Sequence, residues 1–171
     1  DALPIYTKTL TDLREAVFLA CICGGTTDAA VISLGGIVAF KSLRVAGDKL
    51  NNDIISYVRS EFKILIGEKT AENIKINIGA ILPGDAPLEA TIKGRDLITG
   101  LPREVVVTDT DIREALSPSI EALIEGTREV LETTPPEILA NCTIPSENLF
   151  ERFATKYCAP VPVFLRIKEM P

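Results

Sequence analysis

The chain contains no histidine. Its absence removes the side chain that most often acts as a general base near neutral pH, together with Ser-His-Asp and Cys-His arrangements and most catalytic zinc sites. Few hydrolytic mechanisms remain without it. We therefore assign no catalytic residue.

Long apolar runs and basic clusters are also missing. The longest apolar run, residues 16–23, falls well short of the roughly 20 residues that a membrane helix needs, and no basic, cleavable leader precedes it. A net charge of -6 with no cluster of Lys and Arg disfavours phosphate backbones as partners. The sequence predicts a soluble, intracellular chain without a transmembrane segment. It also predicts that the chain does not bind nucleic acid.

What is present suits a folded domain. The 171 residues are 46% hydrophobic and 25% charged, enough to bury a core in one globular unit, with room for two lobes. Three β-rich runs, residues 16–23, 29–34 and 37–46, are separated by glycine pairs, which is typical of hairpins. The central run is mostly apolar, so we expect helices to cover it.

Helical spacing follows these strands. Apolar positions predict an amphipathic helix over residues 48–62, and a second helix is expected from Thr70, as its cap, to Gly79. Turn residues and alternation then predict a small meander with turns at Gly94 and at residues 100–102. Together these elements form a small α+β insertion lobe.

The last third returns to helices. A helix is predicted from Thr110 to Glu132, with a kink or a fresh start at Pro118 capped by Ser117. A helix near residues 146–157 and a strand near residues 161–167 should follow, with Pro160 and Pro162 indicating an edge position or the start of the strand. The predicted fold class is α/β, a mixed sheet flanked by helices, with a core lobe formed by residues 1–47 and 111–171 and an insertion lobe formed by residues 48–110.

Four cysteines leave several interpretations open. Cys21 and Cys23 lie two residues apart in a strand pattern, so their side chains share one face, and Cys142 or Cys158 could complete a thiolate set. Zinc sites usually contain C-x-x-C, and buried free cysteine is common. We assign no metal site and keep a metal or redox module of these four cysteines as an alternative.

Five blocks of sequence carry a family resemblance. The blocks are residues 24–38 (GGTTDAAVISLGGIV), 44–48 (RVAGD), 66–75 (IGEKTAENIK), 94–102 (GRDLITGLP) and 134–137 (TPPE). In order, they resemble the second domain of the MreB family of bacterial actin-like cell-shape proteins, within the superfamily of actin and the heat-shock chaperone ATPases. The resemblance covers about residues 18–138 and implies an actin-like core lobe with a ribonuclease H-like fold.

The resemblance implies ATP with Mg²⁺ as cofactor. Backbone N–H groups at a glycine turn can approach phosphate oxygens closely and threonine hydroxyls add donors, so by resemblance Gly24, Gly25, Thr26 and Thr27 contact the phosphates. On its residues alone, a Gly-Gly-Thr-Thr turn is more often an ordinary hairpin, and the flanking blocks of the resemblance favour the phosphate contact.

The adenosine contacts implied by the resemblance lie further along the chain. Glu72 and Lys75 share one helix face and would bind the ribose and base, with Gly47 at the floor of the cleft. A solvated Glu-Lys pair on a helix surface is the alternative for these two residues.

Two departures from the family pattern concern catalysis and binding. Cys21 stands where the family has an acidic residue that organises the metal and the attacking water, and Cys23 replaces the first glycine of its hairpin. Residues 138–147 contain no glycine where the family has a Thr-Gly-Gly-Gly loop beside the adenosine. We expect this chain alone to have no catalytic activity.

Three functions remain in contention. The first is a cytoskeletal domain, cytoplasmic and at the inner membrane face through its partners, which would be actin-like subunits and cell-wall elongation proteins. The second is an ATP-binding domain with residual ATPase activity through Thr26, Thr27 and Asp28, although Asp28 is interpreted as an outward-facing turn residue. The third is the cysteine module. Because two domains must close on ATP in the family, we expect this single domain not to form filaments alone.

Overall fold

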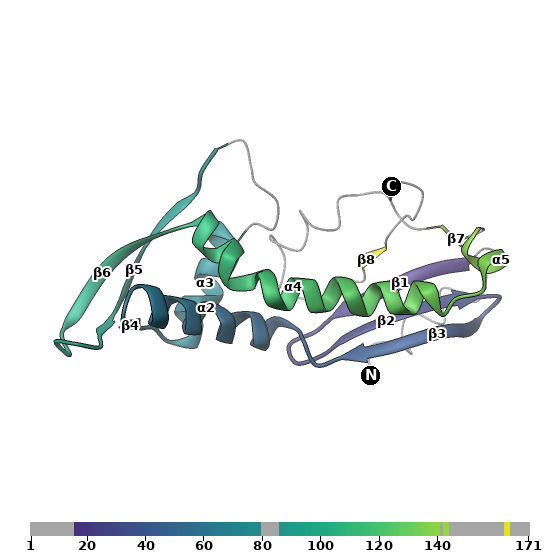
Figure 1. Cartoon of the computed structure of the whole chain (residues 1–171), viewed down its shortest axis with the longest axis horizontal. Helices are drawn as coiled ribbons and strands as arrows, with labels where there is room; N and C mark the ends of the chain where they lie inside the picture. The colour runs from purple at the N-terminus through teal and green to yellow at the C-terminus, as the bar shows by residue number, and fades with distance from the viewer. Residues whose placement is uncertain (1–15, 80–85, 141, 144–162, 165–171) are drawn as a thin grey trace. The chain divides into compact units, whose positions relative to one another are not determined.

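The computed structural model describes residues 16–79, 86–140, 142–143 and 163–164 (Figure 1). The described residues form two compact units. The first holds the residues before Gly47 and those after Glu121, and the second holds residues 47–121. The predicted helix near residues 146–157 lies outside the described residues, as does most of the predicted last strand.

The first unit is built on a mixed sheet with the strand order β3-β2-β1-β7. Strands β1 (Ala16–Ile22), β2 (Thr27–Ser33) and β3 (Gly36–Leu43) form an antiparallel meander. Strand β7 (Cys142–Thr143) pairs with β1 in parallel, and β8 (Val163–Phe164) pairs with β1 in the antiparallel sense. The predicted three-strand meander and mixed sheet are confirmed.

Helices cover one face of this sheet. Helix α4 (Asp109–Glu132) runs along β1 to β3 with its C-terminal half, and the short helix α5 (Pro136–Leu139) follows it (Figure 1). Val130 of α4 is buried in one cluster with five residues of the strands, and Leu131 and Ile138 pack against that cluster. The strand members are Phe18, Ala20, Ala29, Val31 and Ala39. The expectation that helices cover the apolar strand β2 is therefore confirmed.

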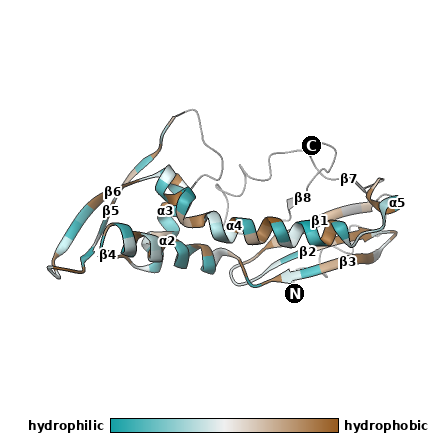
Figure 2. Ribbon diagram, in the orientation of Figure 1, coloured by the Kyte–Doolittle hydropathy of each residue, from teal (hydrophilic) through white to brown (hydrophobic). Residues whose placement is uncertain are grey.

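The second unit pairs two helices with a small sheet. Helices α2 (Gly47–Glu61) and α3 (Glu68–Ile78) flank β4 (Ile64–Leu65), and β4 joins β5 (Glu89–Asp96) and β6 (Pro102–Thr108) in an antiparallel sheet. Teal and brown residues both occur along α2 in Figure 2, as the predicted amphipathic pattern requires. The apolar side is buried, with Leu50, Ile54 and Val58 at or below 3% exposure.

Two local predictions in the second unit are wrong, and one strand was not predicted. Helix α3 begins at Glu68 with Gly67 as its N-cap, so Thr70 does not cap it. Gly94 lies inside β5 instead of a turn, because β4 comes so close that a Cβ there would meet the Leu65 carbonyl oxygen at 2.8 Å. Strand β4 was not predicted, because its two residues are too few to show the alternation of a strand.

Helix α4 is continuous through Pro118. The predicted fresh start with Ser117 as cap is therefore wrong, and the Ser117 hydroxyl instead donates to the Glu121 carboxylate at 3.1 Å. Proline removes one helical hydrogen bond. Burial of Leu116, Ser119 and Ile120 on either side of the proline offsets that loss, as does the hydrogen bond from Ser119 to Asp53 of α2.

Candidate functional site

The turn between β1 and β2 holds the predicted phosphate-binding residues. The hairpin is closed by the Cys23 N–H, which donates to the Thr26 carbonyl at 2.9 Å. Gly24, Gly25 and Thr26 are exposed, and Thr27 opens β2. Because the two glycines are exposed and lack a Cβ, an anion can approach the backbone of this turn closely.

Thr27 differs from its neighbours in the hairpin. Its side chain is buried, with 4% exposure, and its hydroxyl donates to the Val45 carbonyl at 2.6 Å. A hydroxyl has one proton to donate, so in this arrangement Thr27 offers a ligand only its lone pairs. The hydrogen bond fixes the turn to the segment that leads into α2, and the role of Thr27 as a phosphate donor stays a prediction.

The second unit brings together two predicted adenosine contacts. The Lys75 ammonium on α3 donates to the carbonyl of Gly47, the first residue of α2, over 3.4 Å. Lys75 is only 4% exposed, and Glu72, one helical turn earlier, is half-buried. Burying an ammonium group is costly unless oxygens surround it. Lys75 is therefore not the solvated surface lysine of the alternative interpretation.

Asn51 is a polar residue near Gly47 that sequence reasoning missed. It lies one turn after Gly47 on α2, is 5% exposed, and its Oδ1 accepts no hydrogen bond within the described part of the chain. The signal available in the sequence was an asparagine directly after Leu50, in the apolar stripe of the helix.

Cys21 and Cys23 stand beside the hairpin. Their sulfurs are 3.5 Å apart, so the expectation that they share a face is confirmed. Burial raises the pKa of Cys21 to about 11, helped by the hydrogen bond with Cys23 and by the negative charges of Cys23 and Asp28. The side chains of Cys142 and Cys158 lie outside the described residues.

Asp28 is not the outward-facing turn residue that was expected. It is the second residue of β2, half-buried and paired with Cys21 across the sheet. The turn ends two residues earlier than the sequence suggested, because β2 begins at Thr27, which already pairs with Ile22.

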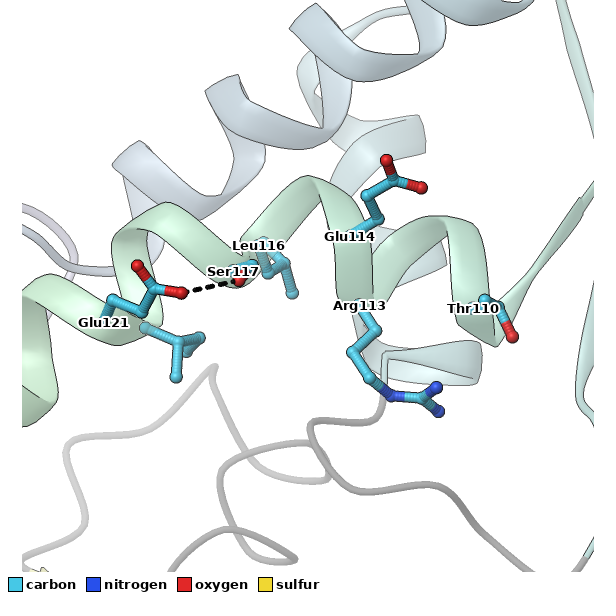
Figure 3. Close-up of a pocket in the computed structure, with 7 residues that line it drawn as sticks. Thr110, Arg113, Glu114, Leu116, Ser117 and Glu121 are labelled. Carbon is cyan, nitrogen blue, oxygen red and sulfur yellow. Dashed lines mark hydrogen bonds between the residues drawn. The ribbon is translucent and has the colours of Figure 1, made fainter.

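A hollow of about 420 Å³ lies along α4, and none of the predicted site residues lines it (Figure 3). Two consecutive helical turns provide its apolar residues, Leu116 and Ile120, and charged groups come from Arg113, Glu114 and Glu121. Within the part of the chain that the structure describes, no group of three or more Cys, Asp or Glu side chains is placed to hold a metal ion. The described helices include none with the length and apolarity to cross a bilayer.

The chain is similar to known proteins over most of its length. A family model described as MreB/Mbl protein matches residues 12–144. The cell shape-determining protein Mbl of Bacillus subtilis is 46% identical over 120 residues, which are 70% of this chain and 36% of that protein. The cell shape-determining protein MreB of Escherichia coli is 42% identical over 120 residues, 70% of this chain and 35% of that protein.

A solved structure is similar as well. The crystal structure of MreB5 of Spiroplasma citri bound to AMPPNP superimposes with a TM-score of 0.75 at 37% identity, covering 80% of this chain and 41% of that chain. The chain thus spans about a third of the length of the curated relatives it matches.

Proposed function

Because the chain belongs to the MreB/Mbl family, we propose that it is part of an actin-like filament protein that guides cell shape and holds ATP with Mg²⁺. Two relatives are named as determinants of cell shape, and a solved relative is bound to the ATP analogue AMPPNP. The partners would be further actin-like subunits and cell-wall elongation proteins. The location would be the cytoplasm, at the inner membrane face through those partners.

The observation that carries the nucleotide proposal is the burial of Lys75 against Gly47. A lysine at 4% exposure whose ammonium group contacts a backbone carbonyl is a fixed donor, suited to a ribose or base oxygen or a ring nitrogen. Glu72, one turn away, supplies an acceptor of the kind that ribose hydroxyls need.

The exposed turn at residues 24–26 would receive the phosphates in this proposal. Its glycines let backbone N–H groups approach closely, and the hydroxyl of Thr26 adds a donor. The magnesium ion would arrive with the phosphates. When bound, it would neutralise part of their charge.

The proposal includes no hydrolysis by this chain. By resemblance, Cys21 occupies the position of the family's acidic residue, and sulfur is a poor ligand for Mg²⁺ where a carboxylate is a good one. The competing ATPase function, through Thr26, Thr27 and Asp28, predicts steady release of phosphate from bound ATP. Release no faster than in a protein-free control would exclude it.

Isothermal titration of the chain with ATP and magnesium tests nucleotide binding. We expect Lys75→Met to weaken binding tenfold to about a hundredfold, the typical worth of a hydrogen bond from a charged donor. Lys69→Met is the matched control, since Lys69 is an exposed lysine on the same helix. Glu72→Gln should weaken binding in the same way.

Thermal unfolding of each variant checks the fold, because methionine fills most of the space of a lysine stem. Equal affinity of the Lys75→Met and Lys69→Met proteins would refute the adenosine contact. No heat and no thermal shift of the unaltered chain at millimolar ATP would refute nucleotide binding altogether.

A further inference from the structure

The pair Cys21 and Cys23 carries an inference that the nucleotide proposal does not use. Cys21 lies next to the last residue of β1, and Cys23 is the first residue beyond that strand. Both side chains are half-buried free thiols, and their sulfurs are 3.5 Å apart. Two thiols held at this distance can act as one chelating group.

A disulfide between them does not suit the backbone. Residues two apart in a strand have Cα atoms about 6.6–6.8 Å apart, at the upper end of the range of about 4.4–6.8 Å that disulfides allow. Closing the bridge would bend β1 where Cys21 pairs with Asp28 and where the Cys23 N–H is bonded to Thr26.

A metal chelate suits the same backbone better. With metal–sulfur bonds of about 2.3 Å and tetrahedral angles, two thiolates on one zinc-like ion lie about 3.8 Å apart. The observed separation of 3.5 Å reaches that value through a small rotation of either side chain and no movement of the strand. Thiolates select soft cations over Mg²⁺ and Ca²⁺.

We propose that Cys21 and Cys23 together bind one soft, thiophilic metal ion at the end of β1. Each thiol gives up its proton on binding, so one divalent ion releases two protons and forms two metal–sulfur bonds. The remaining coordination positions are filled by water or by a small added ligand. The bound ion would link the end of β1 to the start of the turn at residues 24–26.

This site is independent of the nucleotide site. It requires neither Lys75 nor Glu72, and it would persist if the chain bound no ATP. Conversely, loss of both sulfurs leaves Gly24, Gly25 and Thr26 in place. The two proposals can therefore fail separately.

Titration of the reduced, metal-free 171-residue chain with Cd²⁺ tests the proposal. Cadmium serves as the probe because thiolate ligation produces an ultraviolet charge-transfer absorption. In the Cys142→Ser/Cys158→Ser variant, which leaves only the proposed pair, we expect one ion per chain and protection of both remaining thiols from alkylation. Cys21→Ser and Cys23→Ser should each lower the affinity by more than the roughly 10–100-fold typical for loss of an outer-shell partner.

The opposite pattern would overturn the proposal. Loss of binding in the Cys142→Ser/Cys158→Ser variant would assign the ion to those cysteines. Unchanged affinity in Cys21→Ser and Cys23→Ser would show that the pair is not the ligand. Serine is nearly isosteric with cysteine, and Cys21→Ala and Cys23→Ala, with thermal unfolding of each variant, separate loss of ligation from loss of the fold.

Discussion

At the scale of single residues, Asp96 shows how one side chain organises a turn. Its Oδ1 accepts from the backbone N–H groups of Ile98 and Thr99 at 2.8 and 2.9 Å, and its Oδ2 accepts from Arg103 at 3.2 Å. The hydrogen bonds from Thr99 and Ile98 lower the pKa of Asp96 below its ordinary 3.8. The turn leaves Ile98 at 82% exposure. Brown colour is visible at the end of the β5–β6 hairpin in Figure 2.

Asp96→Asn is therefore expected to lower the melting temperature at neutral pH. Because the folded pKa lies below the unfolded one, Asp96 contributes its full stabilisation above the unfolded pKa of about 3.9 and loses it as pH falls through the lowered folded pKa. The melting temperatures of the variant and the unaltered protein should converge in acid. A difference that stays constant from neutral pH into acid would contradict this role.

At the scale of elements, α4 tolerates a proline in its interior. The helix runs from Asp109 to Glu132 with Pro118 exposed near its middle. Proline there forgoes one backbone hydrogen bond at a cost of about 3 kcal/mol relative to alanine in a free helix. Buried neighbours hold the helix together around it.

Pro118→Ala should accordingly stabilise the protein. The restored hydrogen bond stabilises the helix, and the greater freedom of the unfolded chain cancels only part of that effect. The net gain in the free energy of unfolding is about 1–3 kcal/mol. Denaturation by urea measures it. A Ser117→Ala variant is the control, since Ser117 is exposed and next in sequence; a loss of stability in Pro118→Ala would mean that the proline supports the helix.

The same elements show what the sequence reveals. Alternation and glycine pairs located β1, β2 and β3, and the 3.6-residue period located α2, because these signals are local. Gly94 was predicted to form a turn because glycine is common in turns. Glycine is also found where two backbones approach closely, and only the approach of β4 shows that this second reason applies to Gly94. The burial of Lys75 was equally hidden, since it depends on where α2 lies against α3.

At the scale of the whole molecule, the chain is similar to one part of its longer relatives. It belongs to the MreB/Mbl family but spans about a third of the length of its curated relatives. The boundaries expected for a core lobe at residues 1–47 and 111–171 and an insertion lobe at 48–110 stay a prediction. In the proposed function, filament formation needs two domains that close on ATP.

The isolated 171-residue chain is therefore expected to remain unassembled with ATP and magnesium. High-speed sedimentation and light scattering measure this, with the chain in nucleotide-free buffer as the baseline. Filaments that sediment from this chain alone would show that the contacts for assembly lie entirely within it.

The central claim is the proposal that this chain binds ATP with magnesium. Amide hydrogen exchange with and without Mg·ATP tests it most directly. The account predicts slower exchange at residues 24–27 and around Gly47 and α3, with no change in the turn at residues 97–101, which serves as an internal reference. Unchanged exchange at both segments under saturating nucleotide, or slowing confined to the reference turn, would contradict it.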